Sequence, residues 1–215
     1  MPNTTFHSKP VLRILLTALL AISAFQSLAQ GTNWIPLFNG KELDGWITND
    51  FAGAGEVRVE DGQVIIGTGI ALTGIKKKEA PYTSNYEVMI EAMKIQGDDF
   101  FCGFTFPVKD AHATLIVGGW GGSLVGFSSV DGMDASENDT SKSLYFERNR
   151  WYHVRMRVQE DKILVWIDDQ KVIDVETKGR KIATRPGDID RGIPLGIATW
   201  QTSSALKNIK LRTIR

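Results

Sequence analysis

The fold of this chain is decided by residues 151–158, Trp-Tyr-His-Val-Arg-Met-Arg-Val, in which side chains alternate in character. Every second residue from Tyr152 to Val158 is apolar, whereas His153 and the two arginines that follow it at the same interval are polar. Successive side chains of a strand point to opposite faces. This period of two therefore predicts a β-strand with one buried and one polar face.

The same alternation recurs along the chain. Residues 163–167 and 172–175, each preceded by a polar turn, predict a three-stranded meander together with the first segment. Residues 86–93 alternate in the same way, and Asp61-Gly62 separates two short β-rich runs as in a hairpin. No segment keeps a helical apolar stripe over three turns. The sequence predicts an all-β, two-sheet sandwich.

The first residues are typical of a secretory signal peptide. Lys9 and Arg13 precede an apolar run over residues 14–25, and small residues follow it up to Ala29. We expect cleavage after Ala29, export to the periplasm or the extracellular space, and no stable membrane insertion afterwards. Removing 29 of 215 residues leaves 186, which fits a single domain over residues 30–215.

Composition narrows the classes of molecule that the protein is expected to bind. Without residues 1–29 the 25 basic residues become 23 against 25 acidic ones, so the net charge is about −2. A nucleic-acid binder would need a basic stripe, which is not visible along the sequence, so no nucleic-acid partner is expected. Cys102 is the only cysteine and lies in an apolar run, where a small buried residue is expected.

Carboxylates on the strand over residues 86–93 are candidates for chemistry. Glu87 and Glu91 share one face, but four residues of strand place their backbones about 13 Å apart. Retaining glycosidases need carboxyl groups about 5 Å apart. The pair therefore does not suit that reaction, and both are expected to be solvent-facing.

A glycine-rich segment brackets one tryptophan. Gly118 to Gly122 read Gly-Gly-Trp-Gly-Gly, and glycines of this kind usually serve a special backbone geometry. Trp120 at its centre is either a platform for the apolar face of a sugar ring or a cap on the core. Trp200 is expected to lie in the core.

Residues 131–139 form the densest oxygen cluster in the sequence. Asp131, Asp134 and Glu137 would suit a hard cation such as calcium, although the spacing does not match an EF-hand and a solvated acidic loop is the other interpretation. The cofactor is otherwise unknown, and a divalent metal ion is the candidate. His153 and Arg155 lie on a polar strand face that is also able to line a groove for hydroxyls or carboxylates.

The segment over residues 36–46, Pro-Leu-Phe-Asn-Gly-Lys-Glu-Leu-Asp-Gly-Trp, carries a family signature. It resembles the opening Leu-Phe-Asn-Gly-Lys-x-Leu-x-Gly-Trp of the DUF1080 family, also called the 3-keto-disaccharide hydrolase domain. The similarity extends through residues 59–62, the strand that begins at Trp151 and residues 196–198. The resemblance implies a concanavalin A-like jelly roll, secretion and an activity of the glycosyl hydrolase type.

The resemblance also implies a mechanism. The substrate is a sugar already oxidised to a ketone at C3, which acidifies the C2 proton, so one base starts elimination and water then adds. Glu91 matches the family's strand glutamate and is the expected base. Trp120, Arg155 and His153, singled out above from their own positions in the sequence, are the expected sugar-binding residues. Glu91 and Trp120 are then expected to border one groove.

Two functions remain open at this point. The first is a glycoside hydrolase-like enzyme acting on 3-keto-glycosides. The second is a non-catalytic carbohydrate-binding module on the same scaffold. Both make carbohydrate the partner.

Overall fold

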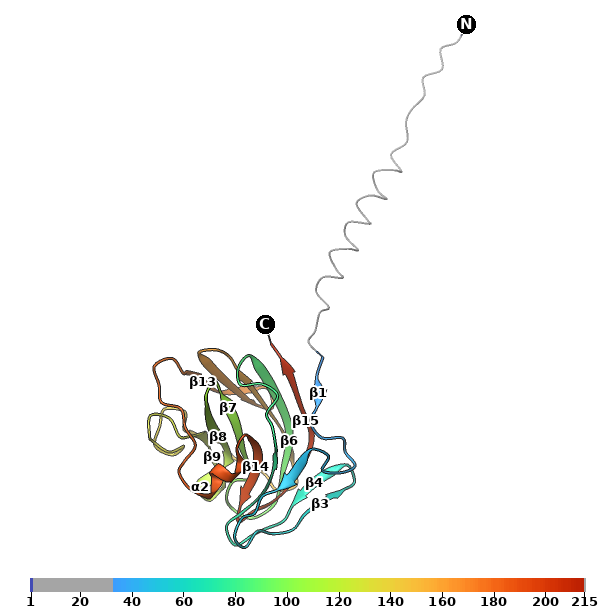
Figure 1. Ribbon diagram of the computed structural model, residues 1–215, viewed down its shortest axis with the longest axis vertical. Helices are drawn as coiled ribbons and strands as arrows, with labels where there is room; N and C mark the ends of the chain where they lie inside the picture. The colour runs from blue at the N-terminus through green and yellow to red at the C-terminus, as the bar shows by residue number, and fades with distance from the viewer. Residues whose placement is uncertain (2–32, 215) are drawn as a thin grey trace. The chain divides into compact units, whose positions relative to one another are not determined.

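The computed structural model describes residue 1 and residues 33–214 of the chain. The expected signal peptide, residues 1–29, falls almost wholly outside these described residues. The domain starts at Trp34 and is built from two antiparallel sheets, which give a β-sandwich (Figure 1). Among the described residues no helix has the length and apolar character needed to cross a membrane.

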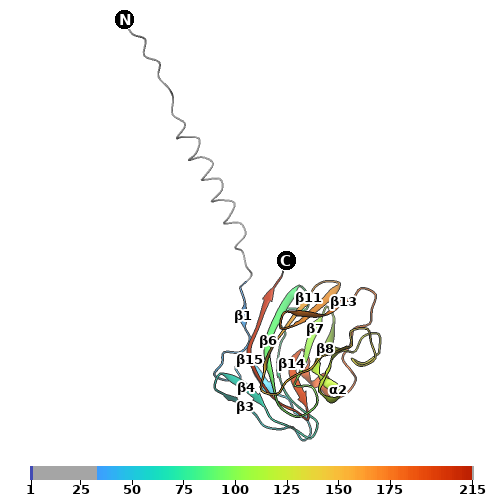
Figure 2. The ribbon, with the colours of Figure 1, turned by 180° about the vertical axis from the view of Figure 1, so that it is seen from behind.

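The larger sheet has eight strands, in the order β13-β12-β11-β6-β15-β4-β3, with β1 paired to β15. Segments far apart in the sequence meet in it, since β6 lies between β11 and β15 (Figure 2). Its strands are β1 (Ile35–Pro36), β3 (Val57–Glu60), β4 (Gln63–Ile66), β6 (Tyr86–Gln96), β11 (Trp151–Val158), β12 (Lys162–Ile167), β13 (Gln170–Glu176) and β15 (Ser203–Thr213).

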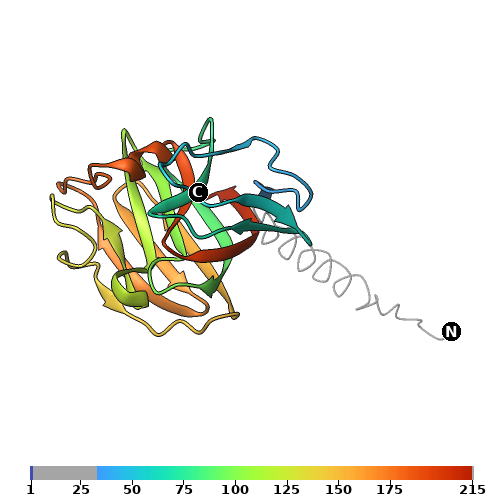
Figure 3. The same cartoon turned by 90° about the horizontal axis from the view of Figure 1, so that it is seen from below.

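The smaller sheet has seven strands, in the order β10-β9-β8-β7-β14-β5-β2. The 3-10 helix η2 (Asp188–Gly192) lies against this sheet, beside β14, β5 and β7 (Figure 3). A short turn labelled α2 (Gly119–Gly122) joins β8 to β9. The strands are β2 (Trp46–Thr48), β5 (Leu72–Lys77), β7 (Cys102–Val108), β8 (Ala111–Gly118), β9 (Leu124–Ser128), β10 (Lys142–Ser143) and β14 (Leu195–Trp200).

The main core lies between the sheets and is supplied by alternate residues of the strands. Val88 and Ile90 of β6 face it from one side, and Phe104 of β7 and Leu115 of β8 face it from the other. Cys102 is also buried there, and burial raises the pKa of its thiol to about 12. The expected small buried cysteine is therefore confirmed.

A second apolar cluster lies on the other face of the seven-stranded sheet. It contains Phe51, Leu72, Phe100, Ile116, Ala135 and Ala198. On β8, Leu115 belongs to the main core and its neighbour Ile116 to this second cluster, so each face of the strand contributes to an apolar cluster. The second cluster forms the base on which a groove is built.

Candidate functional site

A groove of about 480 Å³ opens on the outer face of the seven-stranded sheet. Its floor comes from the strands and its walls from the loop before β7, the α2 turn and the segment that ends in η2. The residues around it are Leu72, Asp99, Phe100, Thr114, Ile116, Trp120, Ser128, Arg185, Pro186, Gly187, Asp188, Ile189 and Trp200. The groove thus combines an apolar base with a few charged groups, as ligand sites usually do.

Trp120 lines this groove because the backbone of the α2 turn has an unusual conformation. Trp120 itself has a left-handed conformation, with φ of 48° and ψ of 63°, and the residue is 43% exposed. Gly118 and Gly121, with φ of 81° and 83°, supply the turn that β-carbon-bearing residues rarely adopt. A Cβ on Gly118 would also lie 2.8 Å from the ring of Phe101. The expected special role of these glycines is confirmed, and Trp120 is not a cap on the core.

Trp200 provides a second aromatic side chain. It is the last residue of β14, lines the same groove and is 38% exposed. The expectation that it lies in the core is wrong, because alternation along β14 places Ile197 in the main core and turns Ala198 and Trp200 to the outer face. Two large indoles therefore border the cavity.

Asp99 is the carboxylate that lies half-buried in the groove. Burial raises the pKa of this carboxyl above its ordinary value, while the backbone N–H groups of Phe100 and Trp120 oppose that shift. The Phe100 N–H donates to its Oδ1 at 2.7 Å. The Thr202 hydroxyl fixes the loop through the Asp99 backbone. It accepts from the Asp99 N–H and donates to the Asp99 carbonyl oxygen, each at 3.2 Å. Perturbed carboxyls in clefts are typical of acid–base sites.

Arg185 brings a positive charge to the lining of the groove. Its guanidinium lies 2.8 Å from Asp134, and its side chain remains 62% exposed. Asp134 is held in turn by the Ser128 hydroxyl at 2.5 Å and by the Ala135 N–H at 2.7 Å. The groove therefore contains an anchored cation that faces solvent and carries free donors.

The sequence alone did not reveal Asp99 or Arg185. Asp99 belongs to the pair Asp98-Asp99, in a loop between two strands, and resembles any solvated turn. The neighbouring residue Phe100 is what distinguishes Asp99 from an ordinary turn residue. Phe100 is 8% exposed and anchors the loop on the second apolar cluster. Arg185 lies in a segment with no strand pattern, so only the fold brings it to the cavity.

Glu91, the expected base, does not line this groove. It lies on the outer face of β6 in the other sheet, where Asn208 donates to its Oε1 at 2.7 Å. His153 and Lys207 flank it, each with a nitrogen 3.6 Å from a carboxylate oxygen. The expectation that Glu91 and Trp120 border one groove is wrong, since the two outer faces point away from each other.

The expected sugar-binding residues are likewise divided between the two sheets. Trp120 lines the groove, whereas His153 and Arg155 lie beside Glu91 on the outer face of the eight-stranded sheet. Arg155 bonds Glu87, which is fully buried rather than solvent-facing as expected. These residues therefore make two separate surfaces.

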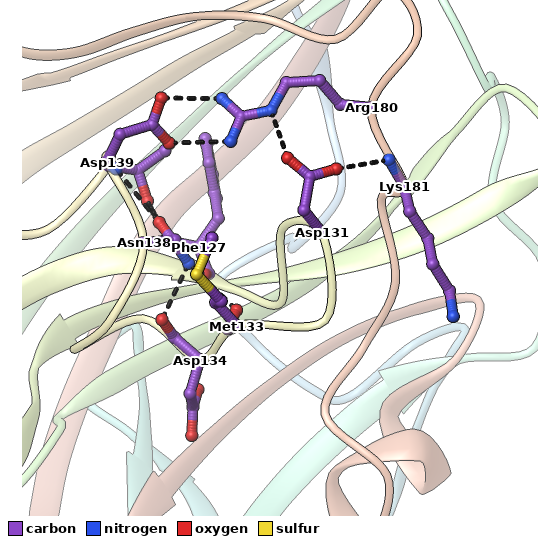
Figure 4. Close-up of polar contacts among 9 residues, drawn as sticks. Phe127, Asp131, Met133, Asp134, Asn138, Asp139, Arg180 and Lys181 are labelled. Carbon is purple, nitrogen blue, oxygen red and sulfur yellow. Dashed lines mark hydrogen bonds and ion pairs between the residues drawn. The ribbon is translucent and has the colours of Figure 1, made fainter.

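The carboxylates proposed as metal ligands stabilise the loop over residues 131–139 instead, and Figure 4 shows the bonds of Asp131. Asp131 accepts from the Arg180 Nε and from the Lys181 N–H, both at 2.8 Å. These bonds lower the pKa of the Asp131 carboxyl. Buried Asn138 holds the loop from within by donating to the carbonyl oxygens of Phe127, at 2.8 Å, and of two loop residues.

The other two proposed ligands are also engaged. Asp134 pairs with Arg185, and Glu137 accepts from the Asp134 N–H at 3.2 Å. Over residues 33–214 no three His, Cys, Asp or Glu side chains are grouped to hold a metal ion. The donor set of Asp131, Asp134 and Glu137 therefore does not fit a divalent cation, because arginines compensate two of its carboxylates.

Comparison with known proteins places the chain in a family. The model of the family described as the 3-keto-alpha-glucoside-1,2-lyase-like domain matches residues 33–212. The match confirms the resemblance seen in residues 36–46. No curated protein sequence matches the chain.

Three solved structures illustrate the fold. A β-glucanase from Bacillus licheniformis has 12% identity, covering 87% of this chain and 100% of that one, with a TM-score of 0.55. A non-specific endo-beta-1,3(4)-glucanase from family GH16 has 8% identity, with 86% and 94% covered and a TM-score of 0.58. Carbohydrate binding module CBM66 from Bacillus subtilis has 15% identity, with 79% and 96% covered and a TM-score of 0.52. At these identities the likeness shows the concanavalin A-like jelly roll alone.

Proposed function

Since the chain belongs to the family of 3-keto-alpha-glucoside-1,2-lyase-like domains, we propose that it binds and cleaves a 3-keto-glycoside in the groove between Trp120 and Trp200. The observation that carries this proposal is Asp99. A half-buried carboxylate with a raised pKa lies in a cavity bordered by two exposed indoles and an anchored arginine.

Asp99 is the proposed base. A ketone at C3 makes the C2 hydrogen of the sugar acidic, and the carboxylate takes that proton, leaving an enolate. The electron pair then forms a C1–C2 double bond and the C1–oxygen bond breaks, and the leaving alkoxide takes up the proton that Asp99 removed from C2. Water adds across the double bond to complete hydrolysis. The raised pKa of Asp99, caused by its burial, strengthens the carboxylate as a base.

Arg185 supplies the electrostatic partner of this step. Negative charge develops on the C3 oxygen as the C2 proton leaves, and a fixed donor at that oxygen stabilises the enolate. The bond to Asp134 holds the guanidinium of Arg185 in place, and a guanidinium has five N–H donors, so donors remain for the sugar.

The two indoles orient the substrate. Trp120 and Trp200 are each about two-fifths exposed and offer flat apolar surfaces with a polar edge, which suit the apolar face of a pyranose ring. Stacking on either side fixes the ring over the apolar base of the groove. Ser128 and Thr114 add hydroxyls to the lining for the sugar's own hydroxyl groups.

Turnover of paired substrates tests the proposal. The wild type should cleave a 3-keto-α-glucoside disaccharide and leave the unoxidised disaccharide intact. Asp99→Asn keeps the shape and the bond from Phe100 but removes the base, so kcat should fall about 10²- to 10⁴-fold while sugar binding persists. Glu91→Gln is the matched control, because Glu91 lies on the other sheet. A loss of turnover in Glu91→Gln with none in Asp99→Asn would return the base to Glu91.

A non-catalytic carbohydrate-binding role is the second candidate. The ion pair between Arg185 and Asp134 favours this role, because it already occupies some of the hydrogen-bond donors of the guanidinium and partly neutralises its charge. Such a module would use Trp120 and Trp200 in the same way. Binding of both oxidised and unoxidised disaccharides with equal affinity, and turnover of neither, would support the module and contradict the enzyme.

A further inference from the structure

The outer face of the eight-stranded sheet carries a second ordered surface, remote from the groove. Its central strand β6 places Glu87, Met89 and Glu91 on this face in sequence order. The two neighbouring strands place cations beside them. Arg157 and Arg212 flank Glu87, Arg155 and Lys210 flank Met89, and His153 and Lys207 flank Glu91. We call this surface, consisting of Arg155, Arg157, Lys207, Lys210 and Arg212, the cationic face.

Positive charge exceeds negative charge on the cationic face. Its five cations face two carboxylates on β6, a net of +3. Glu87 alone is shared by three arginines, with nitrogens 2.8 to 3.3 Å from its oxygens. Across residues 33–214, Lys210 makes no ion pair with a carboxylate within 4.0 Å. The chain as a whole is neutral, so this excess is local.

Tryptophans hold these cations against the sheet. The Arg155 guanidinium lies 3.9 Å from the Trp166 ring centroid, and the Lys207 ammonium lies 4.0 Å from that of Trp151. The Arg212 guanidinium lies 4.6 Å from the ring centroid of Trp34. Stacking of this kind restricts the side chains, so less entropy is lost when they bind an anion.

The geometry of the strands sets the spacing of the charges. Alternate residues along a strand are about 6.7 Å apart, and the two rows that flank β6 are about 10 Å apart. A small anion would contact one or two of these cations. A linear polymer with anionic groups at regular intervals would contact a whole row.

We propose that the cationic face binds an acidic polysaccharide, separately from the groove. The polymer is identified by charge complementarity, and its carbohydrate nature rests on the proposed function. Nucleic acid fits less well, because single strands bind by stacking bases on open aromatic faces. Here a cation covers the ring of each of the three tryptophans. Carboxylates of uronic acid units are suitable partners for the guanidinium forks.

The experiment is a titration of the whole protein with oligogalacturonate, monitored by calorimetry at several salt concentrations. Lys207→Gln/Lys210→Gln removes two charges from the face and leaves the three arginines around Glu87 in place. Lys41→Gln/Lys78→Gln is the matched control, since it makes the same change in net charge at exposed positions elsewhere.

The wild type should bind oligogalacturonate at low salt and lose affinity as salt is added. At about 0.2–1 kcal/mol for each exposed ion pair, the Lys207/Lys210 variant should bind about two- to thirtyfold more weakly, whereas the control should match the wild type. Neutral dextran should not compete. No binding by the wild type, an equal loss in both variants, or equal or tighter binding of oligothymidylate would overturn the proposal.

Failure of this proposal is distinguishable from failure of the proposed function. Asp99→Asn alters only the groove and should bind oligogalacturonate as the wild type does. The Lys207/Lys210 variant should in turn keep the turnover of 3-keto-disaccharides.

Discussion

Glu87→Gln should destabilise the fold more than any other neutralisation of a carboxylate on the same strand face. The Glu87 side chain is fully buried, and the three guanidiniums around it keep 27% to 32% of their side chains exposed. Removing one partner from a buried pair costs about 3–5 kcal/mol. Water reaches these arginines and glutamine keeps some hydrogen bonds, so we expect a loss of about 2 kcal/mol.

The effect is measurable by urea unfolding and by thermal melting. For a domain of this size, about 2 kcal/mol corresponds to a decrease in Tm of about 4–8 °C. Glu91→Gln is the control, because Glu91 lies on the same face of β6 with 16% of its side chain exposed and is not enclosed by arginines. A loss in Glu87→Gln no greater than that in Glu91→Gln would refute the reasoning.

Acid titration adds a second readout of the same site. Burial by itself would raise the pKa of Glu87, but the bonds and charges of Arg212, Arg157 and Arg155 outweigh it and lower the pKa below its ordinary value. A lowered folded-state pKa stabilises the fold above the unfolded value, and this contribution disappears as pH falls through the folded value. Wild-type stability should therefore decrease below about pH 4.3, and Glu87→Gln should lack this part of the decrease.

Four further predictions concern the groove and the N-terminus. Because burial raises the Asp99 pKa, the acid limb of kcat/KM should lie above about pH 4, and Asp99→Asn should melt no lower than the wild type. Trp120→Ala should weaken sugar binding about two- to tenfold in calorimetry, from the loss of about 0.5–1.5 kcal/mol of stacking. Gly118→Ala should lower the free energy of unfolding by about 1–2 kcal/mol or more, because of its positive φ and the Phe101 ring 2.8 Å from the new Cβ. Exported protein should begin at Gln30 by intact mass, and recovery of the chain from Met1 would contradict the signal peptide.

The positions of the strands in the sequence were predictable because period-two alternation is a local pattern. The segment that starts at Trp151 forms β11 over the expected residues 151–158, and β12 and β13 follow as the expected meander. Asp61 and Gly62 both have positive φ at the expected hairpin turn. In each case neighbouring residues decide the backbone, so the sequence carries the information.

The site was less predictable because its position depends on which face of each sheet is on the outside of the sandwich. All seven residues of β7 and the last six of β8 are buried on both faces of the sheet, so alternation of buried and exposed residues does not reveal the groove. Glu87 was expected to face solvent because nothing along β6 indicates that arginines of β11 and β15 enclose it. The sequence placed Arg155 on a polar strand face, but it did not show that cations of β15 lie on the same face, because β11 and β15 are about fifty residues apart in sequence.

The most direct test is the crystal structure of Asp99→Asn with a bound 3-keto-α-glucoside disaccharide, which the variant should bind without cleaving. The sugar ring should stack on Trp120 and Trp200, with its C2 carbon within about 3.2 Å of the residue 99 side chain, the reach of a general base. The C3 oxygen should face Arg185. Sugar density beside Glu91 on the opposite sheet, with an empty groove, would contradict the assignment of the site.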